Sequence, residues 1–153
     1  SGLRRADWTG DAVYLGLDSA VDRAHHRLSL HPSSGSGVLA VEFGVESCDK
    51  VMQQFYLLRD QGLPVRHGPG RRPTSEQVFL TFEGPDDVLY SVVAEGRTLG
   101  QDDRPRQFAA VPEAYCGWGS DCSIPEYLSQ AGGAQGGAPS TRARPQLREV
   151  GKP

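Results

Sequence analysis

The chain has 153 residues, a formal net charge of −3 and a hydrophobic content of 37%. This length suits one ordinary domain. The slightly acidic balance gives no electrostatic reason to bind nucleic acid or anionic membranes. No apolar run reaches the roughly 20 residues that cross a bilayer, and the chain does not start with a signal-peptide pattern. We therefore expect a cytoplasmic, globular protein.

The cysteines are Cys48, Cys116 and Cys122, an odd number without regular spacing. This pattern argues against a secreted disulfide scaffold, and the absence of C-x-x-C disfavours a structural zinc site. Cys116 and Cys122 could pair if their segment turned back on itself. Free thiols in a cytosolic protein are the favoured interpretation.

The first half of the chain alternates apolar and polar residues in short runs. Alternation predicts a strand over residues 12–18 and a second over 25–31. A loop, "PSSGSG", follows and leads to a third strand over 38–45. The period then lengthens to that of an amphipathic helix over 49–61, with Ser47 or Asp49 as N-cap and Gly62 at the C-cap.

After the helix, a short strand over 63–67 enters the Gly/Pro/Arg loop over 68–76, and two more strands cover 77–83 and 88–95. Several strands with a single helix between them predict an α+β fold with a mostly antiparallel, curved sheet. Residues 1–99 would form this domain. Residues 100–130 would be an irregular arm rich in aromatic residues and cysteine, and 131–153 a disordered tail.

The strand–helix–strand–strand–strand order from Val38 to Glu95 resembles the unit repeated in the vicinal oxygen chelate superfamily. That superfamily includes glyoxalase I, bleomycin resistance proteins and type I extradiol ring-cleaving dioxygenases. "YLGLD…HHRLSLHP" resembles the strands that precede the second unit in extradiol dioxygenases, and "LAVEFGVES" resembles the strand that opens it. "LLRDQGLPVRHGPGRR" resembles the end of its helix and the next loop, and "EGPDDVLYSVV" its closing hairpin and strand.

The resemblance covers roughly residues 11–97 and implies a βαβββ module with a curved mixed sheet over about 38–97. It implies a partial first module before that, because the chain would start near the end of that module's helix, at about Leu3. The expected architecture is therefore a module pair that is incomplete at its N-terminus.

The resemblance also implies where the metal ligands of the family would lie. One ligand histidine would fall within residues 38–40, which read Val-Leu-Ala, and the ligand glutamate would fall at Ser91. A neutral serine hydroxyl cannot match the charge of a carboxylate on Fe(II) or Mn(II). The third ligand would belong to the absent first strand. We therefore expect no metal in this chain, and Fe(II) or Mn(II) only in a complete protein.

The string "HHRLSLHP" holds three of the four histidines, so a metal site there needs to be considered. On a continuous strand His25 and His31 share a face but lie roughly 20 Å apart, and His25 and His26 point to opposite faces. Neither pair could then bind one metal. We expect exposed or rim histidines beside a hydrophobic strand, of which one could hydrogen-bond a substrate at the edge of a pocket.

In the family the concave sheet face forms the pocket, and strand parity then turns Glu42 towards it. A carboxylate there needs a partner, for which Arg27 is the obvious candidate. "GPGRR" lacks the lysine–serine pair and the helix of a phosphate loop, which favours a flexible loop over the pocket mouth. No catalytic residue is assigned. The pocket-lining candidates are Tyr14, Arg27, Ser29, Glu42 and Ser91, and the rim candidates are His31, Arg71 and Arg72.

Two functional hypotheses follow from these residues and the resemblance. In the first, the chain is the non-metal-binding part of an extradiol-type ring-cleavage dioxygenase, or of a paralogue, that acts on catechol-type aromatics. In the second, it is a non-catalytic module of the resistance type that binds a small molecule and works as a dimer. A structural remnant that only supports an assembly is a third interpretation. Expected partners are a small aromatic molecule and a second module, in a homodimer or otherwise.

Overall fold

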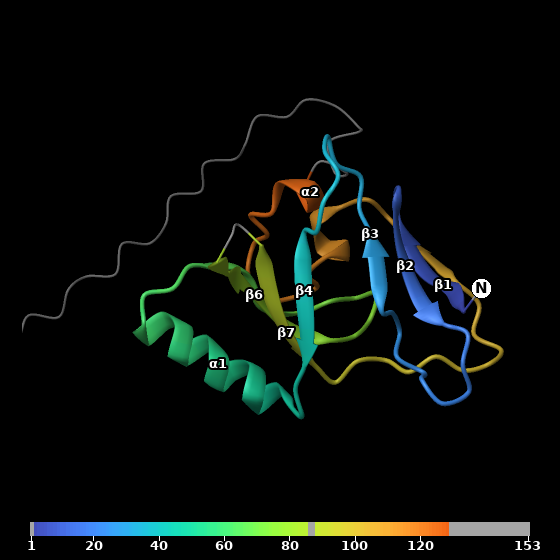
Figure 1. Ribbon diagram of the computed structural model, residues 1–153, viewed down its shortest axis with the longest axis horizontal. Coiled ribbons are helices and arrows are strands. Elements are labelled where there is room, and N and C mark those ends of the chain that lie inside the picture. The colour runs from blue at the N-terminus through green and yellow to red at the C-terminus, as the bar shows by residue number, and fades with distance from the viewer. Residues whose placement is uncertain (1, 86–87, 129–153) are drawn as a thin grey trace, which may run out of the picture.

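The computed structural model describes residues 2–85 and 88–128, which form two four-stranded sheets (Figure 1). The predicted tail over 131–153 lies outside the described residues. The strands of the first sheet run in the order β3-β2-β1-β8. Neighbours are antiparallel except β1 and β8, which are parallel. The four strands are β1 (Leu3–Thr9), β2 (Ala12–Leu17), β3 (Leu28–Leu30) and β8 (Arg106–Phe108).

The second sheet has the order β4-β7-β6-β5, with β4 parallel to β7 and the other pairs antiparallel. One helix, α1 (Cys48–Asp60), connects β4 to β5. This is the predicted strand–helix–strand–strand–strand unit, and the α+β fold class with mixed sheets is confirmed. The strands are β4 (Ala40–Gly44), β5 (Val65–Arg71), β6 (Val78–Glu83) and β7 (Leu89–Ala94).

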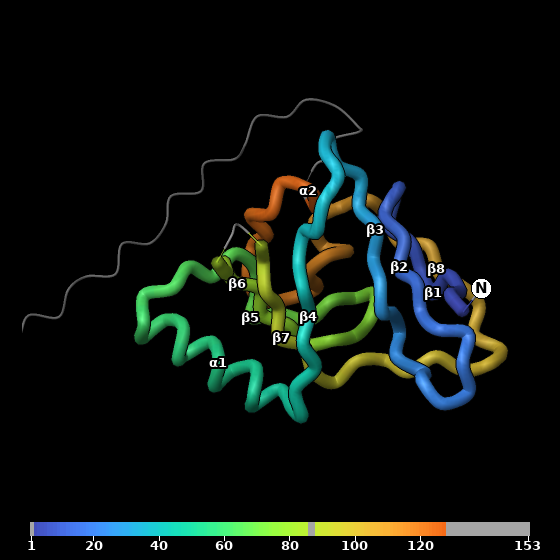
Figure 2. The backbone as a smooth tube through the Cα atoms, viewed as in Figure 1, coloured from blue at the N-terminus to red at the C-terminus, as the bar shows by residue number. Residues whose placement is uncertain are grey.

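The two sheets repeat one arrangement. The order β3-β2-β1 in the first sheet corresponds to β7-β6-β5 in the second. Within the described residues, nothing in the first sheet takes the place that β4 has beside β7. In Figures 1 and 2, β3 and β4 are the facing edges of the two sheets.

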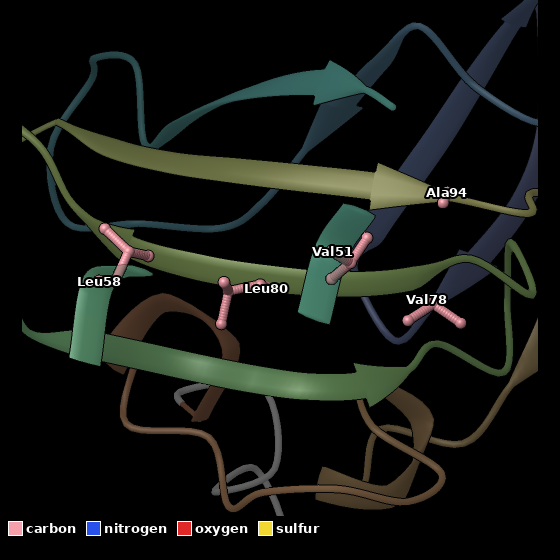
Figure 3. Packing of buried hydrophobic residues seen from close by; sticks show 5 residues of the cluster. All are labelled: Val51, Leu58, Val78, Leu80 and Ala94. Atoms are coloured by element: carbon pink, nitrogen blue, oxygen red, sulfur yellow. The ribbon is translucent and has the colours of Figure 1, made fainter. Parts of the chain in front are cut away.

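Helix α1 forms because its ends are capped and one face is apolar. The Ser47 side chain accepts a hydrogen bond from the Lys50 N–H, as predicted for an N-cap. Gly62 follows the C-cap with a φ of +69°, a left-handed conformation that favours glycine. Val51 and Leu58 of the helix pack on Val78, Leu80 and Ala94 of the sheet (Figure 3). Each of these larger buried side chains contributes about 1.5–3 kcal/mol.

The first sheet differs from the sequence prediction at three strands, β1, β3 and β8, of which β8 (Arg106–Phe108) lies in the segment predicted to be an irregular arm. Strand β1 was not predicted, because Leu3–Thr9 has little alternation and its partners include β8, about 100 residues away. The strand predicted over 25–31 is shorter, because only Leu28–Leu30 pairs with β2. The backbone at His25 and His26 is therefore not extended, and the parity argument fails there.

The predicted loop over 68–76 is also wrong at its start, because β5 continues through "GPGR" to Arg71. Gly68 has a φ of +89°, and a Cβ there would lie 2.6 Å from the Phe79 carbonyl oxygen. A Cβ on Gly70 would lie 2.5 Å from the Cys116 Sγ. The glycines thus allow β5 to lie tightly between β6 and the C-terminal arm, instead of forming a flexible flap.

The predicted arm over 100–130, described as far as Leu128, contains strand β8, a 3-10 helix (Pro112–Ala114) and a short helix α2 (Pro125–Leu128). Tyr115 stacks on Tyr127 with ring centroids 5.1 Å apart, and Ile124 is fully buried. The Trp118 carbonyl accepts from the Arg71 N–H, while its indole is exposed. The three cysteines are free thiols. None of the described helices has the length and apolar character needed to cross a membrane.

Candidate functional site

A cavity of about 910 Å³ lies between the facing edges of the two sheets. Its walls come from β3 and the loop after it, from β4, and from the segment around α2. Its inner end meets a small polar recess of about 20 Å³, and four residues line both spaces. The shared residues are Ser29, His31, Glu42 and Tyr127, and the recess is also lined by Tyr14, His26, Arg72, Thr74, Ala114 and Tyr115.

The strongest contact at this recess is an ion pair between Arg72 and Glu42. The Arg72 Nη2 donates to the Glu42 Oε1 at 2.6 Å, and the two side chains are 11% and 27% exposed. The guanidinium also lies over the ring of Phe79, 4.7 Å from its centroid. Burial alone would raise the pKa of Glu42, but the charge and hydrogen bond of Arg72 outweigh it and hold that pKa below its ordinary value. The pair is therefore charged at neutral pH.

This pairing corrects the expected role of two arginines. Arg27 was expected to neutralise Glu42, but it lies in the bend before β3, is exposed, and pairs with Asp22 at 2.8 Å. Arg72 was expected at a solvated rim, but the continuation of β5 carries it into the interior, where it is only 9% exposed. Arg71 points the other way and pairs with Glu95 at 2.9 Å.

A row of hydrogen-bonded side chains reaches the recess from the first sheet. Asp7 on β1 is fully buried and accepts from the Arg106 Nη2 at 2.7 Å. Its Oδ2 also lies 2.7 Å from the His25 Nε2, and the His25 Nδ1 lies 2.9 Å from the His26 Nδ1. Burial would raise the pKa of Asp7, but hydrogen bonds from Arg106 and His25 keep it low. Burial lowers the pKa of His25, and that of His26 to about 4, so both imidazoles are neutral at pH 7.

The histidines lie much closer together than the sequence prediction placed them. The ring centroids of His25, His26 and His31 lie 6.0, 5.3 and 6.0 Å from that of Tyr14. The expected separation of roughly 20 Å between His25 and His31 is wrong, and so is the divergence of His25 from His26. Both errors arise because the chain bends at these residues instead of continuing as a strand.

Of the other predicted site residues, four line the recess and one, Ser91, does not. Tyr14, Ser29 and Glu42 lie at the wall of the recess, and Tyr14 and Ser29 are directly opposite each other in the β2–β3 pair. His31 lies further inside than a rim, with its Nε2 3.1 Å from the Ser29 Oγ. Ser91 lines neither space, because it is buried in a 2.7 Å hydrogen bond with Thr81. Whether the lining residues bind a ligand stays a prediction.

Sequence reasoning missed the residues that come from unpredicted elements. Asp7 lies on β1, Arg106 on β8, and Thr74 in the turn between β5 and β6. The Arg106 Nη2 donates to the Thr74 carbonyl oxygen at 2.6 Å as well as to Asp7. The one available signal for a buried polar site was Asp7 itself, a charged residue between the apolar residues Ala6 and Trp8.

The described residues do not fit a metal ion. Across residues 2–85 and 88–128, no group of three or more His, Cys, Asp and Glu side chains is arranged to hold one. Ser91, where the resemblance implied a ligand glutamate, lies opposite Glu42 in the β4–β7 pair, and Glu42 is paired with Arg72. A buried guanidinium next to the carboxylate raises the electrostatic cost of a divalent cation there.

Comparisons with known proteins show similarity only at the level of structure. No family model matches the sequence, and no curated protein matches it. The Mn(II)-bound glyoxalase of Novosphingobium aromaticivorans is 24% identical with a TM-score of 0.67, over 82% of this chain and 41% of that one. The 2,2′,3-trihydroxybiphenyl 1,2-dioxygenase of Sphingomonas wittichii is 17% identical with a TM-score of 0.68, over 79% and 43%.

Homoprotocatechuate 2,3-dioxygenase of Arthrobacter globiformis is 18% identical with a TM-score of 0.67, over 82% of this chain and 41% of that one. The chain therefore spans less than half the length of these three solved structures. At these identities the comparisons show a shared fold.

Arg72→Met is expected to lower the free energy of unfolding by roughly 1.5–3 kcal/mol, because it removes a hydrogen bond between charged groups and leaves Glu42, whose side chain is 27% exposed, without its partner. The matched control is Arg27→Met, which removes an exposed arginine from its pair with Asp22. That change should cost no more than about 0.5 kcal/mol. Urea denaturation of both variants measures the difference. Equal losses would contradict the structural role assigned to Arg72.

Stability should fall as the pH is lowered from 7.5 to 5. Burial lowers the pKa of His26, His31 and His67 from 6.5 to about 4 in the folded protein. Between pH 6.5 and pH 4 the unfolded chain therefore binds more protons than the folded protein does. The stability that the neutral histidines contribute is complete above pH 6.5 and is lost as the pH falls towards 4. The loss at pH 5 is at most roughly 2 kcal/mol per histidine.

Urea midpoints at the two pH values measure this loss, and His67→Leu should reduce it. His67 is 2% exposed, and its ring nitrogens have no hydrogen-bond partner among the described residues. A midpoint that is the same at pH 7.5 and pH 5 would show that the histidines are not held neutral by burial.

Proposed function

We propose that this chain, which has the fold of the vicinal oxygen chelate superfamily, is an extradiol-dioxygenase-like domain that binds a small aromatic molecule without a catalytic metal of its own. The observation that carries the proposal is the Arg72–Glu42 ion pair at 2.6 Å. The buried Arg72 guanidinium of this pair lies next to Glu42, which is directly opposite Ser91 in the β4–β7 pair. A neutral or weakly polar ligand suits such a site better than a divalent cation does.

The cavity supports a ligand of this class. Its volume of about 910 Å³ is within the usual range of about 300–1,000 Å³ for small-molecule sites. Leu28, Leu30, Leu39 and Leu89 supply apolar walls, and Tyr127 supplies an aromatic ring at the inner end. Polar groups gather at the recess, so an aromatic body would lie outermost and its polar group innermost.

Ring cleavage, if this chain takes part in it, would depend on a metal held outside the described residues. The chain covers only 41–43% of the three solved structures compared with it. Fe(II) or Mn(II) in another part of a complete protein would supply the oxygen chemistry. This chain would then contribute a ligand-binding or supporting domain for catechol-type aromatics. The alternative, a stand-alone binding module of the resistance type, uses the same cavity and the same residues.

Metal analysis together with ligand titration tests the proposal. Purified protein is expected to contain well under one equivalent of iron, manganese or zinc, and to bind catechol or phenol saturably in the presence of EDTA. Isothermal titration calorimetry measures the binding, and elemental analysis measures the metal. Stoichiometric metal together with ring-cleaving activity would overturn the proposal. A failure to bind either catechol or phenol would also overturn it.

We further propose that the domain pairs with a second module through the exposed apolar side chains of β4. The backbone edge of β4 faces β3 across the cavity, so a strand added there would fill the ligand site. Val41 and Phe43 on this strand are 37% and 52% exposed. Exposed apolar side chains of this kind favour association.

Sedimentation velocity at micromolar concentration should therefore show a dimer. Phe43→Asp should shift the protein to monomer without lowering its free energy of unfolding by more than about 0.5 kcal/mol, because Phe43 is already half-exposed. Tyr56→Asp on the exposed side of α1 is the matched control and should leave the dimer intact. A wild-type protein that sediments as a single monomeric species would refute this pairing.

A further inference from the structure

The contact between Asp7 and His25 determines which nitrogen of His25 carries its proton. Asp7 is ionised and fully buried, so the His25 Nε2, 2.7 Å from its Oδ2, must be the donor. In a neutral imidazole the other nitrogen, Nδ1, is then an acceptor. The tautomer of His25 is thus fixed by a residue of β1.

His25 passes this constraint to His26. The two Nδ1 atoms are 2.9 Å apart, and the His25 Nδ1 has no proton to donate. The His26 Nδ1 must therefore be the donor, which leaves a lone pair on the His26 Nε2. That atom lies 3.8 Å from the Glu42 Oε2, which is also an acceptor and is too far away for a hydrogen bond.

Two acceptors therefore face each other without a proton between them. The His26 side chain is 7% exposed and that of Glu42 27%, so only a few water molecules can reach the space between the two acceptors. Both residues line the recess of about 20 Å³, which exceeds the roughly 10–15 Å³ that one water-sized group needs. The His31 Nδ1 is also buried without a hydrogen-bond partner among the described residues, and His31 lines the same recess.

We propose that the recess between His26 and Glu42 is a subsite for one hydrogen-bond donor, a hydroxyl or neutral amino group on the aromatic ligand. The ring would lie in the larger cavity, which shares Glu42 and His31 with the recess. A water molecule would occupy the subsite when no ligand is bound. Asp7 and His25 are positioning residues, because they act on the ligand only through the tautomer of His26.

This subsite determines which ligands bind. A methyl group in the same place would leave both acceptors without donors. A carboxylate would place a third acceptor beside the Glu42 carboxylate. Ligands with a donor head group should therefore be preferred to apolar and anionic analogues of similar size.

The inference rests on the proposed binding function and is tested by titrating the protein with aniline, phenol, toluene and benzoate. Aniline and phenol should bind at least about tenfold more tightly than toluene or benzoate, as expected when buried acceptors are left unpaired. Toluene binding as tightly as phenol would overturn the subsite and leave the proposed function standing. If none of the four binds, the proposed function itself fails.

A pair of variants locates the selectivity. His26→Leu removes one acceptor and should reduce the ratio of phenol to toluene affinity to less than about threefold. His67→Leu is the matched control, a buried histidine that does not line the recess, and it should leave that ratio unchanged. Equal ratios in both variants would contradict the assignment to His26.

A measurement on the unaltered protein covers the case in which His26→Leu does not fold. Long-range ¹H–¹⁵N correlation spectra at pH 7 report the tautomer of each histidine. His25 should carry its proton on Nε2 and His26 on Nδ1. A proton on the His26 Nε2, or an imidazolium there, would supply the missing donor internally and overturn the subsite.

Discussion

The ion pair between the buried Arg72 and the partly exposed Glu42 is the interaction on which the site depends. It joins the segment that follows β5 to the edge strand β4 of the second sheet. Arg72 reaches this place only because β5 continues past Pro69, in a conformation that Gly68 and Gly70 allow. A charged pair in a largely buried place is stable only while both partners remain. The position of Arg72 and the shape of the recess are therefore determined together.

The first sheet contributes two neutral histidines to the site, and they are held by a charged pair. Asp7 and Arg106 balance each other's charge, and His25 and His26 extend from them towards Glu42. The hydrogen-bonded side chains thus run from β1 towards β4, which do not pair as strands, and they end at His26 in the wall of the recess. His26 and Glu42 face each other there across 3.8 Å without a hydrogen bond. The result is an open cavity with a polar inner end and apolar walls, which suits an aromatic ligand with one polar group.

The sequence predicted the regular elements well and the irregular ones poorly. Strand parity placed Tyr14, Ser29 and Glu42 correctly towards the interior, because β2, β3 and β4 are regular where these residues lie. It failed for His25, His26 and Arg27, which precede the first paired residue of β3. Asp7 and Arg72 could not be predicted, because their positions depend on contacts with β8 and with the arm, far away in the sequence.

An ion pair between Arg72 and Glu42, and not a metal, organises the recess beside β4. Paramagnetic relaxation tests it most directly. Mn(II) is titrated into ¹⁵N-labelled protein while the amide signals of Ala40, Glu42 and Ser91 are followed. Our account predicts only weak, unsaturable broadening at exposed carboxylates, with these three amides unaffected. Saturable broadening centred on Ala40 and Ser91 at micromolar Mn(II) would contradict it, because it would place a metal where Arg72 and Glu42 meet.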